Sequence, residues 1–356
     1  MAAKDNNKFL NIVAGLFLAG FSVYAIKELS SILIPFVLAL IISFLFQPFF
    51  SWMKSKKVPQ ILAIVIVLIT IIIIANIASV FIVASVNSFS EYFNVYEEKF
   101  IKIVNSIVVS LELSSKDIQG INDYLKLSNL MKEGAITNFI GNFLTGFLGI
   151  FGDFVLILLY IIFILSEMAS MKERVKFAFH EERAESITNT LGKIFDDIRT
   201  YILGKTIISL ILGFLSGLIL WLFGVDFYFI WGFLIFITHY IPNIGALFGI
   251  SLPIIVMFLQ FDSFFIPVLV GSILVALDNL IGNIIEPKVL GDKLNLSPLL
   301  LLLSLFAGEY VWGIVGMVLS VPVVSMLKII LMNFDATRPF AVLMSYKPAV
   351  IRKSLF

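Results

Sequence analysis

Long apolar runs with few or no charged residues, separated by polar segments, dominate the chain. A helix needs about 20 mostly apolar residues to cross a hydrocarbon core of about 30 Å. Runs of this kind occur at Phe9–Ile26, Leu29–Phe50, Val58–Ser90, Gly134–Ser166, Thr206–Phe223, Phe227–Gln260, Phe264–Ile281 and Ser297–Met332. The pattern predicts an all-α polytopic membrane protein with about eight transmembrane helices.

Two polar stretches, Glu91–Glu133 and Glu167–Lys205, interrupt the apolar runs. Within each, apolar residues recur every three or four positions, which predicts a helix with one apolar stripe. We therefore expect amphipathic helical segments there. The resulting divisions are 1–90 (three spans), 91–133 (external), 134–166 (the fourth span), 167–205 (cytoplasmic), 206–333 (the helices of the transport path) and 334–356 (a cytoplasmic tail).

The distribution of basic residues predicts the orientation. Lys54, Lys56 and Lys57 lie in the short link between the second and third spans. Short links rich in Lys and Arg stay on the cytoplasmic side. We therefore expect both termini in the cytoplasm of a bacterial cell, with the chain passing several times through its inner membrane.

Two apolar stretches of the C-terminal half are broken. Phe227–Ile241 is roughly 22 Å of helix at 1.5 Å per residue, which is short for a span. It ends at Pro242-Asn243-Ile244-Gly245, and Ser297–Met332 is interrupted around Gly308-Glu309. Each stretch is either one kinked span or a hairpin that enters the membrane and returns. Irregular backbone at membrane depth is tolerated where it is buried or lines a cavity, so both breaks indicate the transport path.

Ionisable residues inside apolar runs are costly and indicate functional positions. Asp153 lies in the fourth span, as a candidate cation or proton site or as a residue near its outer end. Asp278 ends a later run and is followed by Asn279, Asn283 and Glu286. On a regular helix 279, 283 and 286 share one face and 278 flanks it. This polar stripe suits a protein-lined cavity, although an interfacial helix end is an equal alternative.

The breaks themselves supply further candidates. Pro242 removes a backbone donor and frees a carbonyl group, and half-helix ends can bind a polar solute or an ion. Asn243 and Gly245 fit that geometry. Glu309 would lie at the tip of a second hairpin. His239 precedes the first break, where a lone histidine is more often a structural hydrogen-bonding group than a ligand.

Composition excludes several function classes. Hydrophobic residues make up 60% of the chain and charged residues 14%, against roughly 45–50% and about 25% in soluble domains. There is no cysteine, and the net charge of +1 gives no basic field for nucleic acid. Phosphate-loop and His-Glu-x-x-His motifs are absent from the sequence. An aspartyl protease would need a second characteristic aspartate motif, so we expect neither catalytic residues, cofactor nor metal.

Several C-terminal motifs resemble the autoinducer-2 exporter (AI-2E) family of bacterial inner-membrane transporters. They are Ile241-Pro242-Asn243-Ile244-Gly245, the run Asn283-Ile284-Ile285-Glu286-Pro287-Lys288-Val289-Leu290-Gly291, and Leu296-Ser297-Pro298 with the later Gly313-Ile314-Val315-Gly316 and Val321-Pro322. Ile34-Pro35-Phe36 and Gln47-Pro48 also look like family features. The order and spacing of these short motifs carry the resemblance.

The resemblance implies a secondary transporter that exports a small polar solute, with the autoinducer-2 quorum signal as a candidate. A sodium (lithium)/proton antiporter is the alternative, and a non-transporting membrane organiser is another. The family also implies a homo-oligomer, for which a pentamer would fit. The sequence leaves open the substrate, the coupling ion, the direction of transport and the size of the oligomer.

Overall fold

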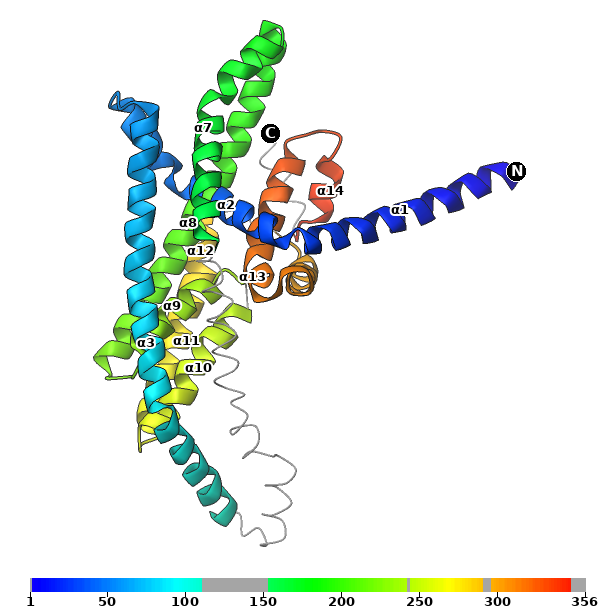
Figure 1. The fold of residues 1–356 in the computed structure, drawn as a ribbon. Coiled ribbons are helices and arrows are strands. Elements are labelled where there is room, and N and C mark those ends of the chain that lie inside the picture. Colours follow the sequence, from blue (N-terminus) through cyan, green and yellow to red (C-terminus); the bar gives the residue numbers. More distant parts are fainter. Residues whose placement is uncertain (1, 111–152, 242–243, 291–295, 347–356) are drawn as a thin grey trace. The chain divides into compact units, whose positions relative to one another are not determined.

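The computed structural model describes residues 2–110, 153–241, 244–290 and 296–346, and these ranges are almost entirely helical (Figure 1). The only β-type contact in these ranges is an isolated bridge between Leu296 and Ser345. The chain divides into two compact units. Unit 1 comprises 1–60, 149–199 and 295–356, and unit 2 comprises 61–148 and 200–294.

Unit 1 is built around the packing of two long apolar helices, α2 (Ser30–Ser55) and α7 (Phe154–Ala178). Phe36 meets Tyr160 edge-on, with ring centroids 5.5 Å apart. Helices α1 (Ala2–Glu28) and α13 (Pro298–Met332) also contact α2. The remaining elements are the N-terminal part of α8 (Glu181–Leu222) and the short helix α14 (Arg338–Leu343).

Helix α13 is a hairpin rather than one rod. Trp312 and Gly313 leave the helical conformation, and Gly313 adopts φ 62°, which a glycine reaches without strain. A Cβ atom on Gly308 would overlap the carbonyl oxygen of Gly316, and one on Gly316 would overlap that of Gly308. The arms 298–311 and 314–332 therefore fold back on each other through backbone contact between these glycines.

Unit 2 contains a second hairpin. It is formed by α9 (Tyr228–Thr238) and α10 (Ile244–Gln260), which pack together. A Cβ atom on Gly245 would overlap the carbonyl oxygen of Thr238, so only glycine allows this close turn. The other elements are α3 (Gln60–Ser110), the C-terminal part of α8, α11 (Phe265–Leu280), the π-helix η1 (Ile281–Ile285) and α12 (Glu286–Leu290).

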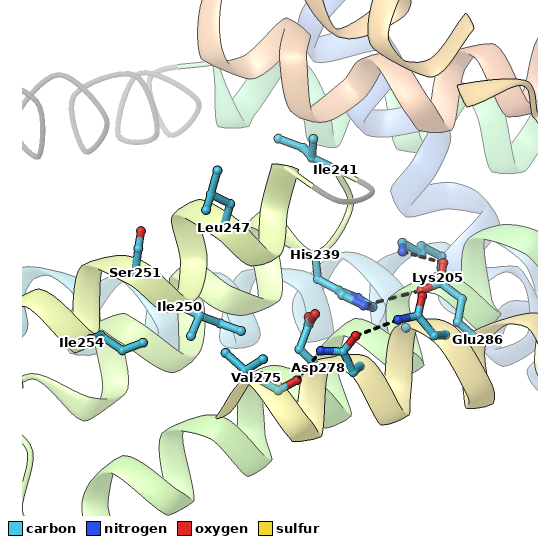
Figure 2. A pocket seen from close by; sticks show the side chains of 13 residues that line it. Lys205, His239, Ile241, Leu247, Ile250, Ser251, Ile254, Val275, Asp278 and Glu286 are labelled. Carbon is cyan, nitrogen blue, oxygen red and sulfur yellow. Dashed lines mark hydrogen bonds and ion pairs between the residues drawn. The ribbon is translucent and has the colours of Figure 1, made fainter. Parts of the chain in front are cut away.

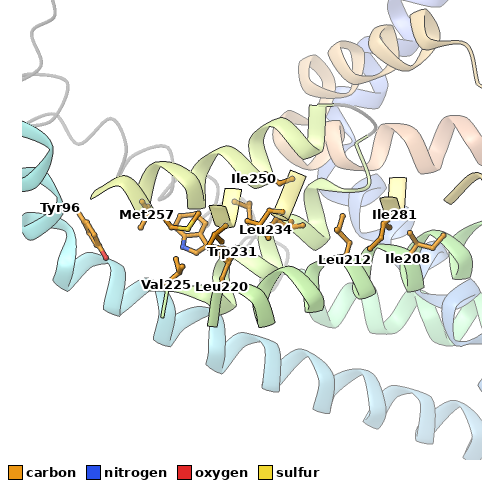
Figure 3. Close-up of a cluster of buried hydrophobic side chains, with 14 of the residues drawn as sticks. Tyr96, Ile208, Leu212, Leu220, Val225, Trp231, Leu234, Ile250, Met257 and Ile281 are labelled. Atoms are coloured by element: carbon orange, nitrogen blue, oxygen red, sulfur yellow. The ribbon is translucent and has the colours of Figure 1, made fainter. Parts of the chain in front are cut away.

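The core of unit 2 lies between this hairpin and its neighbours. Trp231, Leu234 and Met257 are among its buried side chains (Figure 3). Gln260 fixes the open end of the hairpin, because its side-chain amide donates to the Gly224 carbonyl at 2.7 Å and accepts from the Asp226 N–H at 2.9 Å. The hairpin base is thus held at the end of α8, and its tip points toward the other end of the unit.

The predicted fold class is confirmed. Within the described ranges six helices are long and apolar enough to cross a membrane, and Tyr228–Thr238 and Leu247–Gln260 are shorter apolar helices. Large apolar side chains face outward, as lipid requires; Ile61 is 79% exposed and Phe214 68%. The protein is a multi-pass membrane protein, and both broken stretches are hairpins.

The helices do not end where polarity changes. Helix α3 continues without a break from the apolar run through Ser110, into the polar segment predicted from Glu91; residues 111–133 lie outside the described ranges. Helix α7 likewise extends past Ser166 to Ala178, and α8 joins the second polar segment to the fifth apolar run. Hydropathy therefore located the apolar stretches, while the helices extend beyond them.

Candidate solute-binding cavity

An open cavity of about 630 Å³ lies within unit 2, between α8, the tip of the α9–α10 hairpin and α11–η1–α12 (Figure 2). One side is polar, and the α10 side is mostly apolar. The lining residues are Lys205, His239, Ile241, Leu247, Ile250, Ser251, Ile254, Val275, Asp278, Asn279, Gly282, Asn283 and Glu286. This mixture is typical of sites that bind small polar molecules.

A buried ion pair forms the inner end of the cavity. Lys205 Nζ donates to Glu286 Oε1 at 2.6 Å, and the two side chains are only 3% and 11% exposed. Gly204 allows this approach, because a Cβ there would come within 2.5 Å of a Leu290 methyl group. Two charges out of water are stable together only when each compensates the other, so α8 and α12 depend on each other here.

The tip of the hairpin joins this pair through His239, the residue that follows α9. Its Nδ1 lies 2.8 Å from Ser209 Oγ, and its Nε2 lies 3.5 Å from Glu286 Oε2. Figure 2 shows His239, Lys205 and Glu286 converging beside the tip. The adjacent Lys205 ammonium opposes a second positive charge, so we treat the imidazole as neutral. Tyr240 and Thr206 add a hydroxyl–hydroxyl hydrogen bond of 2.7 Å.

A π-turn determines which residues of α11–α12 face the cavity. The N–H of Glu286 donates to the carbonyl of Ile281, five residues earlier. Such a turn accommodates one extra residue, so positions eight apart across it behave like positions about seven apart, or two helical turns. Asp278 and Glu286 therefore line the same cavity, although a regular helix would have placed Asp278 to one side.

Asp278 differs from the other polar residues of the cavity. Asn279 donates to the Val275 carbonyl at 2.8 Å, and Asn283 donates to the Asn279 side-chain oxygen at 2.9 Å. The half-buried Asp278 carboxylate has no hydrogen bond or ion pair to any part of the chain that the structure describes. It lies within electrostatic reach of Lys205 and Glu286.

The remaining predicted residues are distributed differently. Pro242 and Asn243 lie outside the described ranges. Gly245 closes the hairpin turn and offers no side chain to a ligand. Asp153 precedes α7 and Glu309 lies in α13, so both belong to unit 1 and neither lines this cavity. The structure thus gathers Asp278, Asn279, Asn283 and Glu286 from the predicted set.

The sequence analysis did not identify Lys205, and it predicted a structural hydrogen-bonding role for His239. One feature of the sequence could have identified Lys205: it directly precedes the apolar run Thr206–Phe223. A charged residue there needs a compensating partner if it is buried. Among the described residues no three His, Cys, Asp or Glu side chains are grouped as a metal site would require. The cavity chemistry is that of one ion pair, one further carboxylate, amides and an imidazole.

Comparison with known proteins places the cavity in a family context. The sequence profile of the AI-2E family transporter matches residues 12–335, which include every cavity residue. The AI-2 transport protein TqsA of Escherichia coli (strain K12) is 29% identical over 341 residues, covering 94% of this chain and 96% of TqsA. A Borreliella burgdorferi protein is 30% identical over 319 residues, covering 89% and 86%. Its name describes transport provisionally and gives no substrate, as does that of Escherichia coli YhhT, 28% identical over 309 residues.

Proposed function

Because this chain belongs to the AI-2E family of transporters, we propose that it exports a small polar solute through the cavity of unit 2. The observation that carries the proposal is the buried Lys205–Glu286 pair at the inner end of an open cavity about 630 Å³ in volume. Buried charges in membrane helices are retained where they serve a path or a ligand. Transport alters no covalent bond, so we propose no enzymatic activity.

The lining favours a neutral solute rich in hydroxyl groups. Lys205 offers N–H donors, while Asp278 and Glu286 offer acceptors. The apolar side chains of α10, such as Ile250 and Ile254, can cover the carbon skeleton. Cavities of about 300–1,000 Å³ hold ligands of this size. The autoinducer-2 signal is our first candidate, since TqsA is named for its transport.

The position in the cell is part of the proposal. We place the protein in a bacterial inner membrane with both termini in the cytoplasm, because Lys54, Lys56 and Lys57 lie together in one short link. That orientation puts the open base of the α9–α10 hairpin on the outer side and its tip within the membrane. We also propose a homo-oligomer, with a pentamer as the first arrangement to test.

Counterflow in liposomes tests the function. The purified full-length chain is reconstituted with internal unlabelled AI-2, and entry of labelled AI-2 is followed. We expect Glu286→Gln to lower the rate at least about tenfold, because Lys205 is left as an unpaired buried charge. Asp335→Asn, a change at a fully exposed carboxylate of unit 1, serves as the control.

The outcomes separate the alternatives. Counterflow by the wild-type protein that Glu286→Gln removes and Asp335→Asn retains would support the proposal. Absence of AI-2 counterflow, together with sodium-driven proton movement in the same liposomes, would favour the antiporter and overturn solute export. Equal counterflow in the wild type and Glu286→Gln would move the path away from this cavity.

A further inference from the structure

We infer that Asp278 carries a proton inward across the membrane in exchange for the exported solute. This inference rests on the proposed function and assigns its energy source. The observation is a contrast between two carboxylates of one cavity. Glu286 is bonded to Lys205 at 2.6 Å, whereas Asp278 has no such partner in the described part of the chain.

The charges that face the cavity give the reason. Helix α8 contributes Lys205, α9 ends at His239, α11 contributes Asp278 and α12 contributes Glu286; the described lining residues of α10 carry no titratable group. Lys205 and Glu286 cancel, and His239 is neutral. The cavity therefore has a net charge of −1 when Asp278 is ionised and of zero when it is protonated.

Compensation of the Asp278 charge, by a proton or by hydrogen bonds from the solute, determines which forms of the cavity can be closed to water. Moving an uncompensated charge into a low-dielectric environment costs several kcal/mol, even after relaxation. An empty cavity with ionised Asp278 is therefore the form least able to close on one side of the membrane and open to the other. Protonation of Asp278 removes this penalty, so the empty protein returns to the cytoplasmic side carrying a proton.

The solute takes the place of the proton on the outward step. A hydroxyl-rich solute can donate hydrogen bonds to the ionised Asp278 carboxylate, and these replace the lost water. Protonation removes that strong acceptor, so proton and solute compete for the same oxygens. Competition between two ligands is reciprocal, and it produces exchange. One proton enters the cytoplasm from Asp278 for each solute molecule that leaves, and no bond other than O–H forms or breaks.

A proton fits this position better than a metal cation. A calcium ion needs several oxygen ligands, and among the described residues no three His, Cys, Asp or Glu side chains are grouped at Asp278. The Lys205 ammonium already supplies one positive charge to the cavity and repels another. A proton needs only one carboxylate oxygen and no coordination shell.

The test measures solute and proton movement together. Proteoliposomes containing the full-length chain and a pH-sensitive dye receive an AI-2 gradient. For the wild type we expect proton movement opposite to AI-2, near one proton per molecule. For Asp278→Asn we expect AI-2 counterflow to fall, because a neutral amide is a weaker acceptor than a carboxylate. The AI-2 movement that remains should carry no protons, so the number of protons moved per AI-2 molecule should be at least about tenfold lower than in the wild type.

Two further variants keep the result interpretable. Asp278→Glu retains a carboxylate, so AI-2-driven proton movement should persist even if the amide variant does not fold. Asp262→Asn changes a fully exposed carboxylate of the same unit outside the cavity and should behave like wild type.

Two outcomes overturn the inference. AI-2 transport without proton movement in the wild type, or proton movement retained in Asp278→Asn, would refute it and leave the proposed function standing. Failure of every variant, including the wild type, to move AI-2 would refute the proposed function and remove the inference with it.

Discussion

The two hairpins of this protein are built alike and held differently. In α13 and in α9–α10, glycines let the two arms meet through their backbones. The tip of α9–α10 contacts the buried Lys205–Glu286 pair through His239. The tip of α13 is joined to the end of α1 instead, where Trp312 Nε1 donates to the Ile26 carbonyl at 3.0 Å.

The contacts at the tip of α13 attach it to a neighbouring helix, whereas those at the tip of α9–α10 line the cavity. Beside Trp312, the Tyr310 ring lies under Lys27, 4.4 Å from Nζ to the ring centroid, and both side chains belong to unit 1. These are contacts of aromatic side chains with a helix end, and the neighbouring Glu309 is exposed. At the tips of the two hairpins, the charges buried among the described residues lie beside α9–α10; Lys328 is also buried, but in the second arm of α13 and away from its tip. A break in an apolar run therefore identifies a hairpin, while the charge buried beside its tip indicates the hairpin that we propose to bind the solute.

The largest effect should come from breaking the ion pair of the first hairpin. Glu286→Ala leaves Lys205 as an uncompensated buried charge and should lower the free energy of unfolding by about 3–5 kcal/mol. Thermal unfolding of the detergent-purified protein measures the loss. The double variant Lys205→Met/Glu286→Leu removes both charges and should recover most of the stability, yet it should not transport. Stability of Glu286→Ala equal to wild type would show that the pair is open to water.

A smaller effect should follow from separating the arms of either hairpin. Gly245→Ala and Gly316→Ala each place a methyl group against a backbone carbonyl, and overpacking of this kind costs about 1–3 kcal/mol. Both should lower the thermal midpoint. Only Gly245→Ala should also lower AI-2 counterflow strongly, because it displaces His239 and the cavity.

Gly15→Ala is the matched control, since its side chain would meet nothing within 4 Å. Equal transport losses in the two hairpin variants would contradict the distinction drawn between them. A transport loss confined to Gly316→Ala would reverse it.

Local sequence pattern predicted part of this arrangement. The all-α fold, the two breaks and the polar stripe of Asn279, Asn283 and Glu286 follow from hydropathy and helical periodicity. The contribution of Lys205 could not be predicted, because it pairs with a residue 81 positions away. A regular helix predicts a flanking position for Asp278. The π-turn at Ile281–Ile285, which the local pattern does not reveal, brings Asp278 round to the cavity.

The smallest effect should come from the tip of α13. Trp312→Phe removes the hydrogen bond to Ile26 and keeps an aromatic ring, so it should cost about 0.5–1.5 kcal/mol. We expect a small fall in the thermal midpoint and AI-2 counterflow near wild type, because the contact joins α13 to α1 and has no part in the cavity. The corresponding change at the other tip is His239→Phe, which also keeps a ring and removes polar contacts. It should abolish most transport, since it places an apolar ring beside Glu286. Similar transport in both variants would mean that the two tips do not differ in function, and that buried charge does not identify the solute path.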